Sequence, residues 1–146
     1  MRYRPLSSRL YSKNRDHFMR AMEPGGLAVF NSNDIYPISA DSTMPFAQHR
    51  DIFYLSGIDQ EESILLLFPD APSPEHKEIL FIKKTSELIA VWEGQKLTQK
   101  QATALSGIKT ICWLDDFEML FESLASKAHI FYFNTNEHYR ASIETE

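Results

Sequence analysis

Several polar side chains stand directly before an aromatic segment in residues 39–68, SADSTMPFAQHRDIFYLSGIDQEESILLLF. Within this stretch, His49 and Asp51 are two residues apart and could share one face of a strand, which is a weak signature of a metal site or of a small hydrolase. None of the five histidines takes part in the HExxH pattern that places two ligands on one face of a helix. We therefore favour a loop histidine beside a carboxylate at the end of a strand.

The single cysteine, Cys112, is the only thiol that could act as a nucleophile. A reactive cysteine needs exposure and an electropositive setting, but Cys112 lies between Ile111 and Trp113 in a strand that we expect to be buried. A core thiol is the better interpretation. One cysteine also cannot form an internal disulfide, which fits a reducing, cytoplasmic location. The sequence contains neither a GxSxG nucleophile elbow nor a P-loop.

Two pairs of neighbouring carboxylates could also do chemistry. Asp115 and Asp116 precede a predicted helix, where acidic side chains accept hydrogen bonds from free N–H groups. We expect Asp115 to cap that helix. Glu61 and Glu62 follow a glycine turn and fit a solvated loop. A glycosidase-like pair of acid and nucleophile stays open as an alternative, but no second feature of the sequence supports it.

Trp92 belongs to AVWEGQKL, residues 90–97, an irregular segment in which a charged residue and a glycine follow the tryptophan. Packing in the core is one interpretation, since tryptophan is highly buried on average. The other is an exposed aromatic side chain at an interface or a substrate site, where its large rigid surface would contribute to binding.

Length and charge narrow the class of protein. The chain has 146 residues, which suits one domain with a hydrophobic core of its own. Its net charge is −5 and its longest basic run is one pair of lysines, so we expect no nucleic acid partner. The apolar runs are far too short to span a bilayer, and no secretory signal is visible at the start of the chain. We expect a cytoplasmic protein without membrane contact.

The order of the predicted elements indicates an α/β fold. Residues 51–57 are rich in aromatic side chains and end at a glycine, which predicts a strand, whereas 34–50 is a loop long enough to be functional. The spacing of 63–68 and 78–84 predicts an antiparallel pair. We expect a single domain in which a mixed β-sheet of about six strands is flanked by helices. The predicted strands are 27–33, 51–57, 63–68, 78–84, 108–114 and 129–134, and the predicted helices are 6–22, 99–104 and 116–127.

The opening stretch resembles the N-terminal domain of aminopeptidase P, the Xaa-Pro aminopeptidase of the creatinase and prolidase group. A second similar segment is VWEGQKL, and the PGG stop with the strand LAVFNSN also aligns. Many relatives carry a basic residue where this chain has Ala47, with Arg50 nearby. The positions that carry the resemblance are Ser39, Asp41, Ser42, Phe46, Gln48, Asp51, Phe53, Tyr54, Gly57, Glu62 to Leu67, Trp92 and Gly94.

The resemblance implies a domain of the creatinase N-terminal type over residues 1–146, with no catalytic residue and no metal ligand of its own. In this family the catalytic pita-bread domain is C-terminal, and we expect it to be absent from this chain. Two manganese ions are held there by two aspartates, one histidine and two glutamates, and they activate the water that attacks the peptide bond before proline. The implied parent protein is a hydrolase that releases the N-terminal residue preceding proline.

The resemblance also implies what this domain contributes. It helps to form dimers or tetramers and shapes the active site, and Trp92 is the candidate for contact with the proline-containing peptide substrate or a neighbouring subunit. Gln48 and Asp51 are expected to hydrogen-bond backbone groups of the long loop. The residues expected to be structural are Asp41, Gln48, Asp51, Tyr54 and Gly57.

The alternative is a standalone module with the same fold. It would bind a peptide or a protein through residues 34–50 and would have no catalytic partner domain. The residues by themselves leave both hypotheses open.

Overall fold

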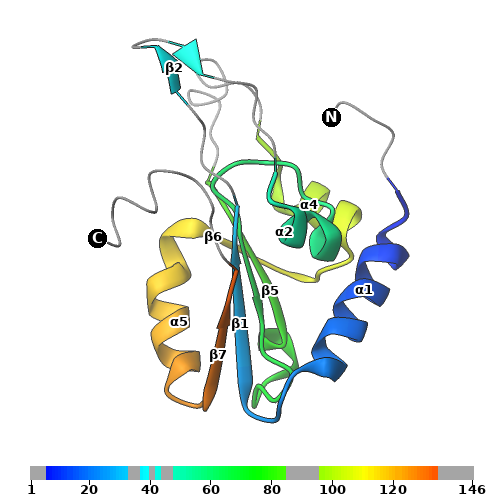
Figure 1. The fold of residues 1–146 in the computed structure, drawn as a ribbon, viewed down its shortest axis with the longest axis vertical. Helices are drawn as coiled ribbons and strands as arrows, with labels where there is room; N and C mark the ends of the chain where they lie inside the picture. Colours follow the sequence, from blue (N-terminus) through cyan, green and yellow to red (C-terminus); the bar gives the residue numbers. More distant parts are fainter. Residues whose placement is uncertain (1–5, 33–36, 40–41, 44–47, 85–95, 135–146) are drawn as a thin grey trace.

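A five-stranded mixed sheet between two helical layers forms the centre of the molecule (Figure 1). The computed structural model describes residues 6–32, 37–39, 42–43, 48–84 and 96–134. The predicted α/β class, a single domain with a mixed sheet flanked by helices, is confirmed. The strands lie in the order β6 (Thr110–Trp113), β5 (Glu78–Ile82), β4 (Ile64–Leu67), β1 (Gly26–Asn31) and β7 (Ile130–Phe133).

Of the α-helices in the described ranges, three pack on one face of the sheet and one packs on the other, and Figure 1 shows this arrangement. The three are α1 (Ser8–Ala21), α2 (Arg50–Ser56) and α4 (Gln99–Ser106), and the one is α5 (Phe117–Ala125). The minor elements are the 3-10 turns η1 (Pro74–His76) and η2 (Leu114–Asp116) and a separate two-stranded ladder of β2 (Pro37–Ser39) and β3 (Ser42–Thr43). In the described ranges, no helix has the length and apolar character needed to cross a membrane.

The three central strands form an antiparallel meander, and each outer strand joins it in parallel. β4 pairs antiparallel with β1 and with β5, and the second of these pairs is the one that the sequence spacing predicted. β6 joins β5 in parallel and β7 joins β1 in parallel. Helix α4 carries the chain from β5 to β6, and α5 carries it from β6 to β7 at the opposite edge. Parallel neighbours need such crossover connections.

Side chains alternate between the two faces along the central strands, so the domain has two hydrophobic layers. Leu65, Leu66 and Leu67 of β4 are consecutive and all buried, because successive side chains face opposite covered layers, which explains the apolar sequence of this strand. Under the three helices the strands contribute Ala28, Phe30, Leu65, Leu67, Leu80 and Ile82. Under α5 they contribute Leu27, Val29, Leu66, Ile79 and Phe81.

The strand predicted at 51–57 is wrong, because these residues belong to helix α2. Its buried positions are Ile52, Leu55 and Ser56, spaced three and four apart as on one face of a helix rather than alternating. Gly57 ends the helix in the left-handed conformation with φ of 71°. Aromatic content favoured a strand, but the caps and the packing against neighbouring helices decide the local structure. The main sheet therefore has five strands instead of about six.

The predicted cap of the last helix is also wrong. Asp115 lies inside η2, and Asp116 at the N-cap position of α5 makes no side-chain capping bond. The 3-10 turn runs directly into α5, so Asp116 has a helical backbone (φ −90°, ψ −1°) instead of the extended one from which a side chain can cap. Thr98 caps α4, since its hydroxyl accepts from the Gln101 amide at 3.1 Å.

Helices α2 and α4 end in the same three residues, Ser-Gly-Ile, at 56–58 and 106–108. In both, the serine hydroxyl donates to the carbonyl four residues earlier, at 2.6 and 2.7 Å. It also accepts from the amide two residues later, at 3.2 and 3.1 Å. Each glycine has a positive φ, so the backbone turns sharply directly after each helix, and the isoleucine that follows the glycine is buried.

Arg15 of α1 is fully buried between these two helix ends. Its Nη1 donates to the carbonyls of Leu55 at 2.9 Å and Ser106 at 2.7 Å, and its Nε forms an ion pair with Glu78 at the start of β5. A cation at the C-terminal end of a helix is stabilised by the helix dipole, and Arg15 serves two helices at once. One side chain therefore joins α1, α2, α4 and β5.

Candidate functional site

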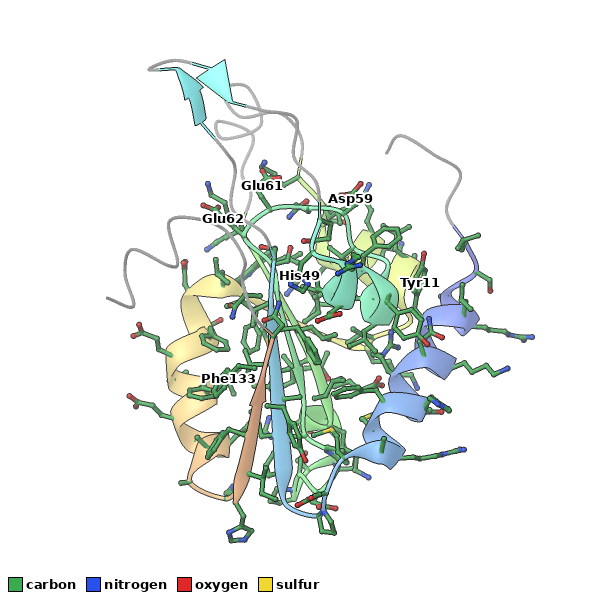
Figure 2. All side chains as sticks on the ribbon, viewed as in Figure 1. Tyr11, His49, Asp59, Glu61, Glu62 and Phe133 are labelled. Atoms are coloured by element: carbon green, nitrogen blue, oxygen red, sulfur yellow. The ribbon has the colours of Figure 1, made fainter. Side chains whose placement is uncertain are left out.

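Gln48 and the acidic turn that follows α2 lie toward the end of the sheet where β1 and β5 finish and β4 begins. Figure 2 shows Asp59, Glu61 and Glu62 together at this end, with His49 close below them. Residues 85–95 connect to the described chain here, through the residues after β5 and those before α4. We call this region the loop end of the sheet.

Gln48 binds backbone groups at the loop end. Its Nε2 donates to the carbonyls of Ile58 at 2.9 Å and Gln60 at 3.1 Å, and its Oε1 accepts from the His49 amide at 2.9 Å. The sequence predicted bonds to the long loop, whereas the two carbonyls belong to the turn that follows α2. Gln48 therefore fixes the residue that precedes α2 to the turn that follows it.

His49 and Asp51, the weak metal candidates, form a helix cap. Nδ1 of His49 accepts from the Asp51 amide at 3.2 Å and lies 3.8 Å from Oδ2 of Asp51. The Asp51 side chain is 56% exposed and stands in the first turn of α2, where the helix dipole favours a negative charge. Because Nδ1 already accepts a backbone N–H, this geometry suits capping and not metal binding.

Tyr54 and Gly57 have unlike surroundings. Tyr54 is 55% exposed, and its carbonyl accepts from Nδ2 of Asn14 at 2.8 Å. Gly57 is buried, and a Cβ atom there would lie only 2.4 Å from Cε2 of Tyr11. Helix α2 thus approaches α1 so closely that this position has room only for glycine. Burial raises the pKa of Tyr11, whose ring forms the wall.

Glu61 and Lys96 form a shielded ion pair, with side chains only 18% and 13% exposed. Burial alone would raise the pKa of the Glu61 carboxyl. The hydrogen bond from Lys96, the Glu61 backbone amide and the positive charges of Lys96 and Lys83 outweigh burial and hold this pKa below its usual range. Glu61 is therefore an ionised anchor and not a general acid at neutral pH.

The residues on either side of Glu61 in the sequence also bind residues that flank segment 85–95. Oε1 of Gln60 accepts from the Leu97 amide at 2.9 Å, and Oε2 of Glu62 lies 3.2 Å from Nζ of Lys83. Sequence reading treated this stretch as a solvated loop. The acidic residues of this turn and the lysines on both sides of 85–95 carry opposite charges, but they are far apart in the sequence, so no local pattern indicated the pairing.

Asp41 and Trp92 lie outside the described residues. Within the described ranges, no three histidine, cysteine, aspartate or glutamate side chains are placed so that they could hold a metal ion. Cys112 is partly buried instead of fully buried, and burial followed by the charge of Asp116 raises the pKa of its thiol. A thiol held protonated in this way is a poor nucleophile.

A surface pocket of about 510 Å³ lies where β5 and β6 begin. Glu78, its most deeply placed acid, is already paired with Arg15, so the pocket brings together no reactive set. Its lining residues are Ser12, Pro74, Glu75, Glu78, Gly107, Lys109 and Thr110.

An aromatic run crosses the face under α5 and ends at the edge strand β7. Phe81 meets Phe117 edge-on at 5.1 Å between ring centroids, and Phe117 stacks on Phe121 at 5.4 Å. Phe131 lies 6.4 Å from Phe121, and Phe133 lies 6.4 Å from Phe131. Phe81 is fully buried, but Phe131 is 41% and Phe133 is 60% exposed. The sequence alone did not predict this exposed surface, because it does not show that β7 lies at an edge of the sheet.

Comparison with known proteins gives a family match over most of the chain. The family model described as "Aminopeptidase P, N-terminal domain" matches residues 11–132. Human Xaa-Pro aminopeptidase 3 is 29% identical over 108 residues, covering 73% of this chain and 21% of that protein. The Xaa-Pro aminopeptidase of Escherichia coli is 22% identical over 138 residues, covering 94% of this chain and 31% of that protein. The chain thus spans less than a third of the length of these relatives.

Solved structures show the same fold. An aminopeptidase P from Bacillus anthracis superposes with a TM-score of 0.80 at 23% identity, over 96% of this chain and 35% of that one. The aminopeptidase PepP of Pseudomonas aeruginosa gives 0.83 at 19% identity, over 97% and 31%. A Glu383Ala variant of the Escherichia coli enzyme, in complex with substrate, gives 0.82 at 22% identity, over 97% and 32%.

Proposed function

This chain belongs to the family of aminopeptidase P N-terminal domains, and from that membership we propose that it is the noncatalytic part of a metal-dependent Xaa-Pro aminopeptidase. The observation that carries the proposal is the unequal coverage: the solved neighbours match at least 96% of this chain, but at most 35% of their own length. Catalysis then belongs to a C-terminal domain outside these 146 residues, which would hold two manganese ions and cleave before proline. The parent enzyme would be cytoplasmic.

The contacts of the described side chains favour a structural role for this domain. His49, Asp51 and Gln48 make capping and backbone bonds, and Glu61 is committed to Lys96. In the described part of the chain, no three histidine, cysteine, aspartate or glutamate side chains are grouped so that they could hold a metal ion. We therefore derive no catalytic step for this domain and assign it the assembly and shaping of the active site. Trp92 is our candidate for contact with the peptide substrate.

The exposed aromatic edge supports a contact role. Phe131 and Phe133 project from β7, whose outer edge has no neighbouring strand in the described sheet. An exposed, apolar sheet edge is a site for association. We assign it to the catalytic domain of the same polypeptide, because β7 is the last described element and the match covers only 31% of the Escherichia coli relative. Subunit contacts within a dimer or tetramer belong to the same proposed role.

Activity measurements on two proteins test the proposal. The purified 146-residue chain is expected to release no amino acid from proline peptides, with or without manganese, while the complete enzyme is active. Cleavage by the 146-residue chain, with contaminating proteases excluded, would contradict a noncatalytic role. A coding sequence that stops after residue 146 would instead favour the standalone binding module.

Trp92→Ala in the complete enzyme tests the substrate contact. Loss of an aromatic contact with the substrate is expected to lower kcat/KM on proline peptides roughly tenfold. Trp113→Phe, which alters the tryptophan of β6, is the matched control and is expected to leave the kinetics unchanged. Unaltered kinetics in Trp92→Ala would remove Trp92 from the proposal without affecting the rest.

A further inference from the structure

The surface pocket where β5 and β6 begin lies at the opposite end of the sheet from the loop end. Its walls come from α1, from η1 with the start of β5, and from the turn between α4 and β6. Its volume of about 510 Å³ falls within the range of small-molecule pockets, about 300–1,000 Å³. Segments this distant in sequence form the pocket only in the folded domain, and the proposed function makes no use of it.

The walls of this pocket are held in place by the buried network around Arg15. Nε of Arg15 pairs with Glu78, which lines the pocket. Its Nη1 donates to the Ser106 carbonyl at 2.7 Å, directly before Gly107 of the wall between α4 and β6. Oγ of Ser106 accepts from the Ile108 amide at 3.1 Å, so this turn is fixed as well. The pocket is therefore preformed, and a ligand would not have to order its walls.

The wall formed by η1 and the start of β5 is acidic. Glu75 is exposed, and its carboxylate has no ion-pair partner in the described part of the chain. Glu78 uses Oε2 for Arg15, whereas its Oε1 accepts no hydrogen bond from the described residues, and the side chain is 28% exposed. Two carboxylates with free acceptor oxygens therefore suit a positively charged donor such as an ammonium group.

The wall between α4 and β6 carries positive charge. Lys109 is exposed and has no ion-pair partner within the described ranges. Nη2 of Arg15 lies behind Gly107, since a Cβ atom on this glycine would be 3.5 Å from it. This Nη2 is buried and has no hydrogen-bond partner among the described residues, so water screens its charge little. Ser12 and Thr110 add hydroxyl groups to the lining.

We propose that this pocket binds a small zwitterion, a free α-amino acid, with its ammonium group toward Glu75 and Glu78 and its carboxylate toward Lys109. A ligand with one charge would meet a like charge at one of the two walls, and this repulsion disfavours it. The proposal goes beyond the noncatalytic role and does not rest on it, because every residue that it uses belongs to the pocket.

Titration of the ¹⁵N-labelled 146-residue chain with three compounds of similar shape tests the site. L-Leucine carries both charges, L-leucinamide lacks the carboxylate, and L-2-hydroxyisocaproate lacks the ammonium group. We expect L-leucine to shift the amide resonances of Gly107, Lys109 and Thr110 saturably, and each analogue to bind roughly threefold more weakly, as loss of one exposed ion pair allows. No saturable shift of these resonances with L-leucine, or equal binding of all three compounds, would overturn the proposal.

Substitutions at the two walls assign each charge to its partner. Lys109→Gln is expected to weaken L-leucine binding roughly threefold and to remove the discrimination against L-leucinamide, because the carboxylate has lost its partner. Glu75→Gln is expected to weaken L-leucine by a similar factor and to reduce the discrimination against L-2-hydroxyisocaproate. Lys127→Gln, at an exposed lysine after α5, is the matched control and should leave all three titrations unchanged.

Circular dichroism checks that each of these variants is folded, since all three substitutions are at exposed side chains. Unchanged L-leucine affinity in both folded wall variants would overturn the proposed site. The amino acid site and the noncatalytic role fail separately. Cleavage of proline peptides by the 146-residue chain would refute the noncatalytic role alone, whereas the absence of saturable shifts would refute the site alone.

Discussion

The two faces of the sheet differ in how fully the rest of the chain covers their apolar side chains. On the face under α1, α2 and α4, buried side chains fill the space and Arg15 joins two helix ends to a strand. On the face under α5, the aromatic run begins in the core at Phe81 and ends at Phe133, which is 60% exposed. The first face packs its apolar side chains internally and pairs the carbonyls of Leu55 and Ser106 with Arg15. The second leaves large apolar rings at an open edge.

This difference indicates how the domain divides its tasks. A face closed by three helices can hold the shape of the domain without help, because both its apolar side chains and its helix ends have partners. A face with exposed aromatic rings beside an unpaired strand edge is suited to a further contact. Removing the buried partners of the helix ends on the first face should therefore lower stability, whereas removing the exposed rings at the edge of the second face should affect association instead.

Arg15→Met should give the largest effect. The substitution leaves two helix-end carbonyls and Glu78 without their buried partner, and breaking one side of a buried pair typically costs about 3–5 kcal/mol. We expect the free energy of unfolding, measured by urea denaturation, to fall by about 3 kcal/mol. Arg9→Met, at an exposed arginine of the same helix, should change it by less than about 0.5 kcal/mol. Equal values for the two variants would show that the three-helix face is not held by Arg15.

Substitution of the glycines that follow α2 and α4 should give the next largest loss of stability. Gly57→Ala places a Cβ atom 2.4 Å from the Tyr11 ring at a positive φ, so we expect a loss of about 3 kcal/mol from clash and backbone strain together. At Gly107 the nearest atom would be 3.4 Å away, so Gly107→Ala should cost only the backbone strain, about 1 kcal/mol. Urea denaturation of both variants measures the difference. Similar losses would mean that the contact with Tyr11 is not tight.

The aromatic edge should give the smallest change in stability. Phe133→Ser removes an exposed ring, and we expect the free energy of unfolding to change by less than about 0.5 kcal/mol. Leu27→Ala, at a fully buried residue on the same face, should cost about 3 kcal/mol. In the complete enzyme, Phe133→Ser should increase amide exchange in β7. A large loss of stability in the 146-residue chain would make this edge part of the core and contradict its role as a contact surface.

Local signals in the sequence located most of the elements. The predicted helix 99–104 lies within α4, and the glycine that follows residues 51–56 marks the end of α2. Apolar runs located β4 and β5, and their spacing gave the pairing. Residues 51–57 were misassigned because phenylalanine and tyrosine are common in strands, whereas here Ile52 and Leu55 lie on one buried side of a helix. Propensity yields to packing when a short segment can be buried in either form.

The loop end could be predicted only in part. Gln48, Asp51 and Gly57 were singled out from the resemblance, and each has a definite place, in a backbone network, in a first helical turn and in a helix cap. The Glu61–Lys96 pair joins residues that are far apart in sequence, so no local pattern announced it. Trp92 stays a prediction, because it lies outside the described residues.

The sequence by itself determined the class of fold and the family resemblance, because periodicity, caps and short motifs are properties of neighbouring residues. Only the tertiary structure decided that Arg15 is buried, that three consecutive residues hold both sides of segment 85–95, and that β7 stands at an edge. Whether a charge is solvated or paired, and whether a strand has one neighbour or two, depends on which distant residues the fold brings beside it.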